Sequence, residues 1–427
     1  MRARLANLDR RLLTILMIVF VQMVGASMVL PVLPLFAQRR FEMSPEVISL
    51  LLASFFIAQF LAGPYIGRLS DRYGRVPVLI VSQIGTVISF FIIAYAQSIP
   101  VLFFARILDG VTGGNIIVAQ AYVTDISPKD RRTQYLGLIF AAFGLGFIFG
   151  PALGGILSAT FNDRFPFIIA GVAASLTVIL TWRTLDETVT AEKRELNRKQ
   201  DAPSLNVMDV IRNSPLLFIL MIAFVFQFGL GLLQATFALY GEAILFNSTI
   251  EQSTQLGYSL LYAQYNDNAV NLGIGLLLTV VGAGQLFTQL VLLQRMVERF
   301  GAARLVIIGL VIRTMSTLVF AIVTTPYLGA VGSILFAIGS GLAVPSLQSL
   351  ATTTVPDELR GGVLGWYQSA QSLSTIFGTA LGGILFSITP TVPYWVASLL
   401  FIVILIPGIF LVRWSDRRTP APEPIPT

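Results

Sequence analysis

The sequence contains no cysteine and no histidine, and only 12% of its residues are charged. Without cysteine the chain can form no disulfide, thiolate metal site or cysteine nucleophile. Without histidine it lacks the commonest general base and any histidine proton relay, so proton chemistry must use Asp or Glu. Carboxylates are not clustered, and no phosphate-binding loop of the G-x-x-x-x-G-K-[ST] type occurs. We therefore expect no enzyme, no ATP-driven pump, no cofactor and no metal site.

Apolar residues make up 55% of the 427 residues, and this leaves too little polar material for a soluble surface. A helix that crosses the hydrocarbon core of a bilayer needs about 20 apolar residues, and only helices satisfy their own backbone there. The sequence predicts an all-α integral membrane protein with twelve transmembrane helices, at residues 12–36, 46–66, 77–97, 100–123, 134–159, 165–184, 215–240, 270–293, 303–323, 328–350, 362–387 and 393–412. The first of them has no cleavage signal and is expected to stay as a span.

Lysine and arginine are distributed unevenly between the two sets of loops. With both termini in the cytoplasm, 23 of the 28 lysines and arginines lie on the inner side. Three lie in outer loops (Arg39, Arg40 and Arg164), and Arg106 and Arg313 lie inside spans. This positive-inside pattern predicts cytoplasmic termini in a cell membrane, plasma or inner, and explains the net charge of +6 without nucleic acid.

The two halves of the chain are related by an internal repeat. Residues 136–157 align without gaps to residues 364–385, an offset of 228, and 13 of 22 positions are identical. Between the halves, residues 185–214 are rich in charge and contain Pro203. We expect a six-helix bundle at 1–184, a cytoplasmic linker at 185–214, and a second six-helix bundle with a short tail at 215–427. Such a repeat is typical of transporters that bind substrate between their halves.

Five motifs carry a resemblance to a known family. "GRLSDRYGR" (67–75) and its echo "QRMVERFGAAR" (294–304) resemble the signature of the link between spans 2 and 3 in the major facilitator superfamily. "GASMVLPVLP" (25–34), "RILDGVTGG" (106–114) and "GFIFGPALGGIL" (146–157) resemble motifs of its twelve-span drug:proton antiporters, and the general look is closest to tetracycline exporters.

This resemblance implies a monomeric secondary transporter that exports a lipophilic drug-like small molecule in exchange for protons by alternating access. The alternative on the same fold is an uptake symporter or uniporter for a sugar, a nucleoside or an organic anion. The antiporter motif in span 5 favours export. The family's acid in span 1 corresponds here to Gln22, which cannot titrate, and this favours the alternative.

By resemblance, the 2–3 link and its echo hold the cytoplasmic ends of the bundles together when the substrate site faces outward. Without the resemblance, Gly67 and Gly74 permit a tight turn and close helix approach, and the charges are those of an ordinary positive-inside loop. The gating residues that we predict are Gly67, Asp71, Arg72, Gly74, Arg75, Asp125, Glu298 and Arg299.

Arg106 and Asp109 are predicted to carry proton coupling. A charge near the middle of a bilayer costs about 2.5–3.5 kcal/mol on insertion scales, and residues three apart share one helix face. The pair is either a protonatable carboxylate tuned by an arginine or an internal salt bridge that stabilises the bundle.

The antiporter motif places small residues at helical spacing, where a neighbouring helix can approach closely, and its proline invites a kink. Its residues are Gly146, Gly150, Pro151, Gly154 and Gly155. Polarity within the spans suggests a substrate site with a few amides and aromatic walls. The candidate lining residues are Gln22, Gln59, Gln227, Gln234, Gln348, Trp366, Gln368 and Gln371.

Overall fold

The computed structural model describes residues 10–128, 131–189, 207–246, 265–356 and 359–418. Over these residues the chain is helical without strands, and twelve helices are long and apolar enough to cross a membrane. The twelve-span prediction is confirmed. The helices of the first half are α2 (Arg10–Phe41), α3 (Pro45–Tyr73), α4 (Arg75–Tyr95), α5 (Ile99–Thr112), α6 (Asn115–Ile126), α7 (Arg132–Thr160) and α8 (Phe165–Thr184).

The second half follows a short helix, α10 (Val207–Arg212). Its elements are α11 (Ser214–Tyr240), the π-helical turn η1 (Gly241–Leu245), α13 (Asp267–Phe287), the π-helical turn η2 (Thr288–Leu292), α14 (Leu293–Phe300), α15 (Ala302–Ile322), α16 (Pro326–Thr352), α17 (Arg360–Ile388) and α18 (Val392–Arg418). Residues 190–206 of the predicted linker lie outside the described residues, so its boundaries stay a prediction.

The fourth span differs from the continuous helix predicted at 100–123. It runs as α5 and α6, with a break at Gly113 and Gly114. Gln59 of α3 donates a hydrogen bond from Nε2 to the carbonyl oxygen of Gly113 at 3.0 Å. Two adjacent glycines weaken a helix, and the amide of Gln59 satisfies a carbonyl that the break releases.

The link between spans 2 and 3 is shorter than its sequence suggested. Gly67 lies inside α3, so the prediction of a turn at Gly67 is wrong, and its gating role stays a prediction. The turn is made at Gly74, whose φ of 111° lies in the region that favours glycine. In the second half Gly301, with a φ of 77°, makes the corresponding turn 227 residues later. The repeat therefore extends to this unusual backbone conformation.

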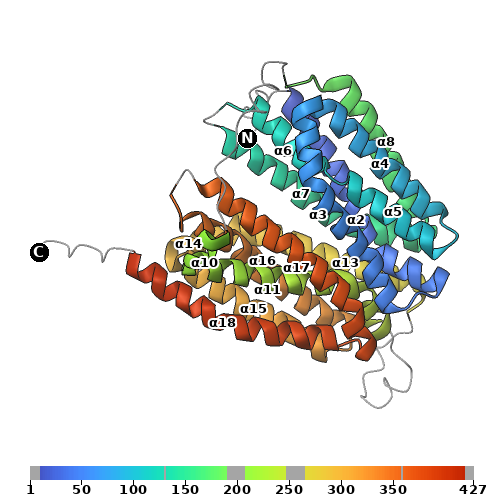
Figure 1. Ribbon diagram of the computed structural model, residues 1–427. Helices are drawn as coiled ribbons and strands as arrows, with labels where there is room; N and C mark the ends of the chain where they lie inside the picture. Colours follow the sequence, from blue (N-terminus) through green and yellow to red (C-terminus); the bar gives the residue numbers. More distant parts are fainter. Residues whose placement is uncertain (1–9, 129–130, 190–206, 247–264, 357–358, 419–427) are drawn as a thin grey trace, which may run out of the picture.

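The helices form two groups, and the first residues of α2 lie at the same end of the molecule as the last residues of α18 (Figure 1). We call this end, where α2 begins and α18 finishes, the terminal end. Three apolar cores fill the groups. One core near the terminal end belongs to the first half and includes Leu12 and Tyr122. A second, with Leu216 and Leu411, belongs to the second half.

The third core joins the two halves at the opposite end. It contains Leu33 and Phe36 of α2 together with Phe237 and Tyr240 of α11. The main helix contacts between the halves are α7 with α13 and α3 with α17. A Cβ atom on Gly275 of α13 would lie 3.1 Å from the Cα atom of Gly155 in α7. The halves are therefore packed backbone to backbone at this end.

Candidate functional site

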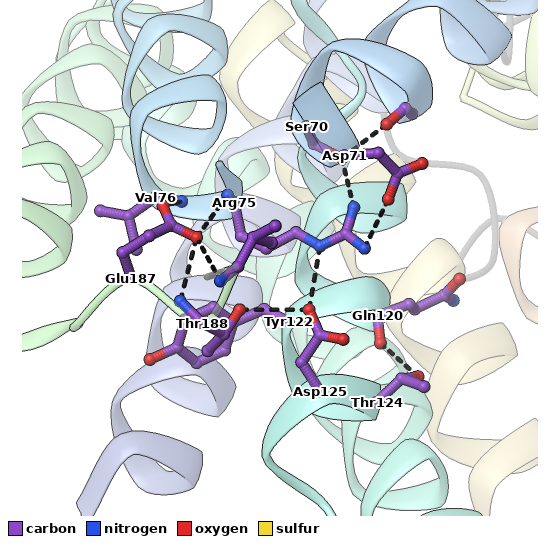
Figure 2. Close-up of polar contacts among 12 residues, drawn as sticks. Ser70, Asp71, Arg75, Val76, Gln120, Tyr122, Thr124, Asp125, Glu187 and Thr188 are labelled. Atoms are coloured by element: carbon purple, nitrogen blue, oxygen red, sulfur yellow. Dashed lines mark hydrogen bonds and ion pairs between the residues drawn. The ribbon is translucent and has the colours of Figure 1, made fainter. Parts of the chain in front are cut away.

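A cluster of polar residues surrounds Arg75 at the terminal end (Figure 2). Its guanidinium lies 2.6 Å from the Asp71 carboxylate and 3.1 Å from the Asp125 carboxylate. It also donates a hydrogen bond to the Ser70 hydroxyl at 2.6 Å. The Arg75 side chain is only 9% exposed, and two carboxylates and a hydroxyl satisfy it there. Figure 2 shows that Asp71 comes from α3 and Asp125 from α6, so the arginine ties three helices together.

Glu187, just after α8, completes this cluster. Its carboxylate accepts hydrogen bonds from the backbone N–H groups of Arg75 at 2.9 Å and Val76 at 3.1 Å. These N–H groups begin α4 and have no acceptor within the helix, and a negative charge is favourable at that position. Thr188 donates to the Asp125 carboxylate at 3.1 Å. Sequence reasoning missed Glu187 and Thr188, and the only signal was an acidic pair directly after a span.

The other predicted gating residues lie outside the Arg75 cluster. Arg72 is exposed, with its guanidinium carbon 5.4 Å from the centre of the Tyr73 ring. Glu298 and Arg299 are exposed on α14, where Glu298 accepts a hydrogen bond from Gln294 at 3.1 Å. The Arg75 contacts described above join elements of the first half and the segment that follows it. A latch between the halves stays a prediction for a conformation in which the terminal ends meet.

Arg106 and Asp109 form an ion pair inside the first bundle. The two groups lie 3.0 Å apart at positions i and i+3 of α5, with side-chain exposures of 6% and 10%. The Arg106 guanidinium carbon lies 4.3 Å from the centre of the Phe55 ring in α3. A Cβ atom on Gly110 would lie 2.7 Å from the Cβ atom of Ala58, so α5 packs tightly on α3 there. The predicted pairing is confirmed, whereas its role in proton coupling stays a prediction.

The glycines of the antiporter motif lie against two different helices. A Cβ atom on Gly146, Gly150 or Gly154 would meet α2, and on Gly150 it would collide with the Ser27 hydroxyl. Ser27 also donates a hydrogen bond to the Gly146 carbonyl at 2.9 Å. Gly155 instead faces α13 of the other half, where its Cβ atom would lie 2.7 Å from the Asn271 carbonyl oxygen. Pro151 lies inside the continuous helix α7. The motif therefore packs α7 within its own half and against the other.

The second half repeats this packing at an offset of 228. A Cβ atom on Gly378 would lie 3.2 Å from the Cα atom of Gly231 in α11, and one on Gly382 would lie 2.9 Å from Ala235. Gly383 faces Pro45 and Ser49 of α3 in the first half. The glycines of α7 therefore pack against α2 of the same half and α13 of the other half. Those of α17 pack in the same way against α11 and α3.

The candidate substrate residues fall into three groups. Gln59 and Gln227 are engaged within their own halves, Gln59 at the break in span 4 and Gln227 with the Thr375 hydroxyl at 2.9 Å. Gln22 and Gln234 each hold one buried amide atom that has no partner among the described residues. The remaining candidates are partly or fully exposed: Gln348, Trp366, Gln368 and Gln371.

Arg313 of α15 is fully buried within the second bundle. Its guanidinium carbon lies 3.3 Å from the centre of the Phe336 ring, 4.9 Å from that of Phe226 and 5.2 Å from that of Phe401. Its three side-chain nitrogens donate to no acceptor in the part of the chain that the structure describes. Aromatic faces attract cations, so the charge is held by rings rather than by a carboxylate.

A second polar cluster lies at the opposite end and joins the two halves. Arg39, in the last turn of α2, lies 2.8 Å from Glu242 in η1 and 3.1 Å from the Asn271 side-chain oxygen in α13. It also lies 3.6 Å from Asp163 of its own half and 3.9 Å from Asp267 of α13. We call these residues, with Ser158, the Arg39 cluster. Sequence reasoning placed Arg39 in an outer loop and gave it no role.

Comparisons with known proteins agree with this architecture. The family model described as Major Facilitator Superfamily matches residues 15–264 and 253–427. The chain is 27% identical to the class H tetracycline resistance protein of Pasteurella multocida, over 96% of this chain and 98% of that protein. It is 29% identical to multidrug resistance protein 2 of Bacillus subtilis (strain 168), over 94% of each chain.

A solved structure has the same fold. It is a bacterial homolog to the human lysosomal transporter Spinster in an inward-facing and unoccupied conformation, and it matches with a TM-score of 0.73 at 14% identity. The match covers 96% of this chain and 98% of that one.

Proposed function

This chain belongs to the major facilitator superfamily of membrane transporters, and we propose that it exports a lipophilic drug-like compound in exchange for protons by alternating access. The two bundles, residues 1–184 and 215–427, would rock about a substrate site between them, with the termini in the cytoplasm and the chain acting as a monomer. The names of the relatives, tetracycline and multidrug resistance proteins, support a drug-like substrate.

The difference between the two ends of the molecule is the observation that carries this proposal. One apolar core spans both halves at the opposite end, whereas each half has its own core near the terminal end. This arrangement supports a conformation closed at one end and separable at the other, which alternating access requires. With cytoplasmic termini it corresponds to an inward-facing state, and the fold match to an inward-facing transporter is consistent with that.

Asp109 is our proposed proton carrier. It lies within a span, where a charge is costly, and its partner Arg106 lies 3.0 Å away. Protonation of Asp109 would end this pairing and leave the arginine with the Phe55 ring, so the first bundle would repack when the proton binds. Such a change in local packing is a means of linking proton occupancy to conformation.

The exposed glutamines support a polar surface between the halves. Gln348 on α16 and Gln368 on α17 are exposed although they lie within spans. Lipid tails cannot satisfy an amide, so an exposed amide in a span is better placed toward an aqueous interior than toward lipid. A site with a few amides among apolar side chains suits a bulky amphipathic ligand.

Proteoliposomes that contain the purified chain and a pH-sensitive dye provide the test. Tetracycline and a panel of lipophilic cations are added under an imposed proton gradient. Export by antiport requires protons to move against the direction of the compound, and symport requires both to move together. Uniport, which the replacement of an acid by Gln22 favours, gives substrate flux without proton flux. Absence of proton movement with every transported compound would rule out the exchange.

A further inference from the structure

The Arg39 cluster bridges the halves at the end where they are packed together. Arg39 belongs to α2 of the first half, and it donates hydrogen bonds to Glu242 at 2.9 Å and to Asn271 at 3.1 Å, both of the second half. Asn271 donates in return to Ser158 at 2.8 Å and to Asp163 at 2.9 Å, both of the first half. The hydrogen bonds therefore cross the boundary between the halves in both directions.

The polar groups of the Arg39 cluster are buried or partly buried, so breaking their hydrogen bonds without replacing them would cost free energy. Asn271 is 4% exposed and Ser158 is 2% exposed. The side chains of Arg39, Asp163 and Glu242 are between 19% and 25% exposed. Charge-assisted bonds in such partly buried positions are stronger than ion pairs at an open surface. If the halves separated at this end, the groups would exchange these partners for water.

The Arg39 cluster contains more negative than positive groups, and Arg39 is the cation that its carboxylates share. One guanidinium lies within 4 Å of three carboxylates, which belong to Asp163 of the first half and to Glu242 and Asp267 of the second. Without the arginine, carboxylates of the two halves would face one another with no cation among these contacts. Like charges at short range repel, so loss of Arg39 turns an attraction between the halves into a repulsion.

We propose that Arg39, Glu242 and Asn271 form the gate that closes the exit at the end opposite the termini. The gate rests on the alternating access proposed above. Its polar bonds and the glycine contact between α7 and α13 close the same end, so both must open before a compound is released there. In this conformation the residues of the Arg75 cluster, at the terminal end, bond to the first half and the segment that follows it. The Arg39 cluster therefore lies at the closed end of the molecule, and the Arg75 cluster lies at the end where the halves can separate.

Distance measurements between spin labels test the gate directly, and the absence of native cysteine means that no background residue has to be removed. One labelled cysteine pair replaces Thr160 and Leu328, which are exposed at the opposite end of the first and second halves. A second pair replaces Leu69 and Val297, which are exposed near the terminal end. Both pairs are measured in lipid nanodiscs without substrate and without a proton gradient.

Arg39→Gln is expected to increase the population with a long 160–328 distance by about tenfold relative to the parent. The 69–297 distance should shorten in the same fraction of molecules. Arg40→Gln is the matched control, since Arg40 is the next residue in α2, is exposed, and stacks on Phe36 and Phe41 of its own half. Arg39→Lys keeps the charge and should restore most of the parent distribution.

Distance distributions of folded Arg39→Gln that match those of Arg40→Gln would overturn the gate. If Arg39→Gln does not fold, Glu242→Gln carries the test, because Arg39 keeps Asp163 and Asn271 and a smaller shift, about threefold, is expected. No shift in that variant would equally overturn the gate. The readout needs neither substrate nor protons. A negative transport assay would therefore count against drug export alone, and unchanged distances would count against the gate alone.

Discussion

Each half of the molecule has one buried arginine in the interior of a span, Arg106 in the first half and Arg313 in the second, and these two arginines have different partners. Arg106 of the first half pairs with Asp109 at 3.0 Å and lies against one ring. Arg313 of the second half lies among three rings, and its nitrogens find no acceptor among the described residues. A pair that includes a carboxylate can change its charge when the carboxylate takes up a proton, whereas Arg313 has no carboxylate beside it among the described residues. We therefore expect the buried arginine of the first half to take part in a proton-dependent switch and that of the second half to contribute to packing.

The glycine helices, by contrast, are the same in both halves. Gly150 and Gly378 occupy equivalent positions 228 residues apart, and each packs against the first helix of its own half. The following glycines, Gly155 and Gly383, each face the other half. Packing between the bundles is therefore symmetric although the buried charges are not. Substitutions of equivalent glycines in the two halves should therefore impair transport equally. Substitutions of the buried charged residues should have different effects in the two halves.

The largest effect is expected from Gly150→Leu, which should abolish transport. A side chain at this position would collide with the Ser27 hydroxyl and lie within 3 Å of the Val24 carbonyl oxygen, so α2 must move away. Gly378→Leu should be as damaging, because its Cβ atom would meet the Phe228 carbonyl oxygen at 2.5 Å. Substrate flux into proteoliposomes, at equal amounts of monodisperse protein, measures the effect.

Val172→Leu is the control for these glycine variants. Val172 lies on α8 and is 46% exposed, so we expect the exposed side of the residue to accommodate an added methylene group. This variant should keep nearly all of its transport. Similar losses of transport in Val172→Leu and Gly150→Leu would contradict the prediction that transport depends on the close packing of α7 against α2 at Gly150.

Asp109→Asn should abolish proton-driven accumulation while sparing downhill exchange of substrate. Asparagine has nearly the same shape as aspartate but cannot ionise. Without proton coupling the protein can no longer drive substrate uphill, but substrate can still cross the membrane down its gradient. Substrate-induced proton flux and counterflow exchange, measured in the same vesicles, separate the two activities. Persistent coupled flux in well-folded Asp109→Asn protein would show that Asp109 is not the proton carrier.

The double variant Asp109→Asn/Arg106→Gln separates the proton carrier from a purely structural pair. Removing both charges leaves neither one unpaired in the bundle, so a structural pair should tolerate the change. If the pair is structural, the double variant recovers expression and uphill transport together. If Asp109 carries the proton, expression recovers and uphill transport does not.

Asp71→Asn should slow transport by about tenfold with a stability change within about 1 kcal/mol. Asp71 is half-exposed and lies 2.6 Å from Arg75, and its loss leaves Arg75 with Asp125. Initial transport rates and thermal unfolding report the two quantities. Asp416→Asn is the matched control near the same end, because Asp416 is exposed and its carboxylate pairs with Arg304 of its own half at 3.2 Å. Near-normal rates in Asp71→Asn protein would rule out the latch.

Local patterns in the sequence predicted much of what lies within the spans. Apolar length predicted the twelve helices, and a spacing of three residues predicted the pair of Arg106 and Asp109. The repeat of 228 residues aligned the glycines of α7 with those of α17, and these two sets pack equivalently. These features depend on neighbours within one helix or on one alignment register, and both can be read without knowing how the helices pack.

The clusters at the two ends could not be predicted in the same way. Arg39 was placed in a loop because hydropathy falls at the charged residues after position 36, yet nothing there breaks the helix and α2 continues to Phe41. Its partner Glu242 is 203 residues away, and Glu187 is 112 residues from Arg75. Such contacts arise when helix ends meet in the folded chain, and no local pattern encodes which ends meet.

The smallest effect on transport is expected at Arg313. Arg313→Leu should leave transport near the parent level, since leucine keeps an apolar side chain among Phe226, Phe336 and Phe401 and removes a buried charge. Replacing a buried charge by an apolar side chain is often neutral or stabilising. Arg313→Ala should instead lower the free energy of unfolding by about 2–4 kcal/mol, because it leaves a cavity between the rings. Thermal unfolding in detergent and transport in proteoliposomes, measured on both variants, decide the matter. Loss of transport in stable, well-folded Arg313→Leu protein would mean that the charge itself takes part in transport, and the contrast between the two arginines would fail.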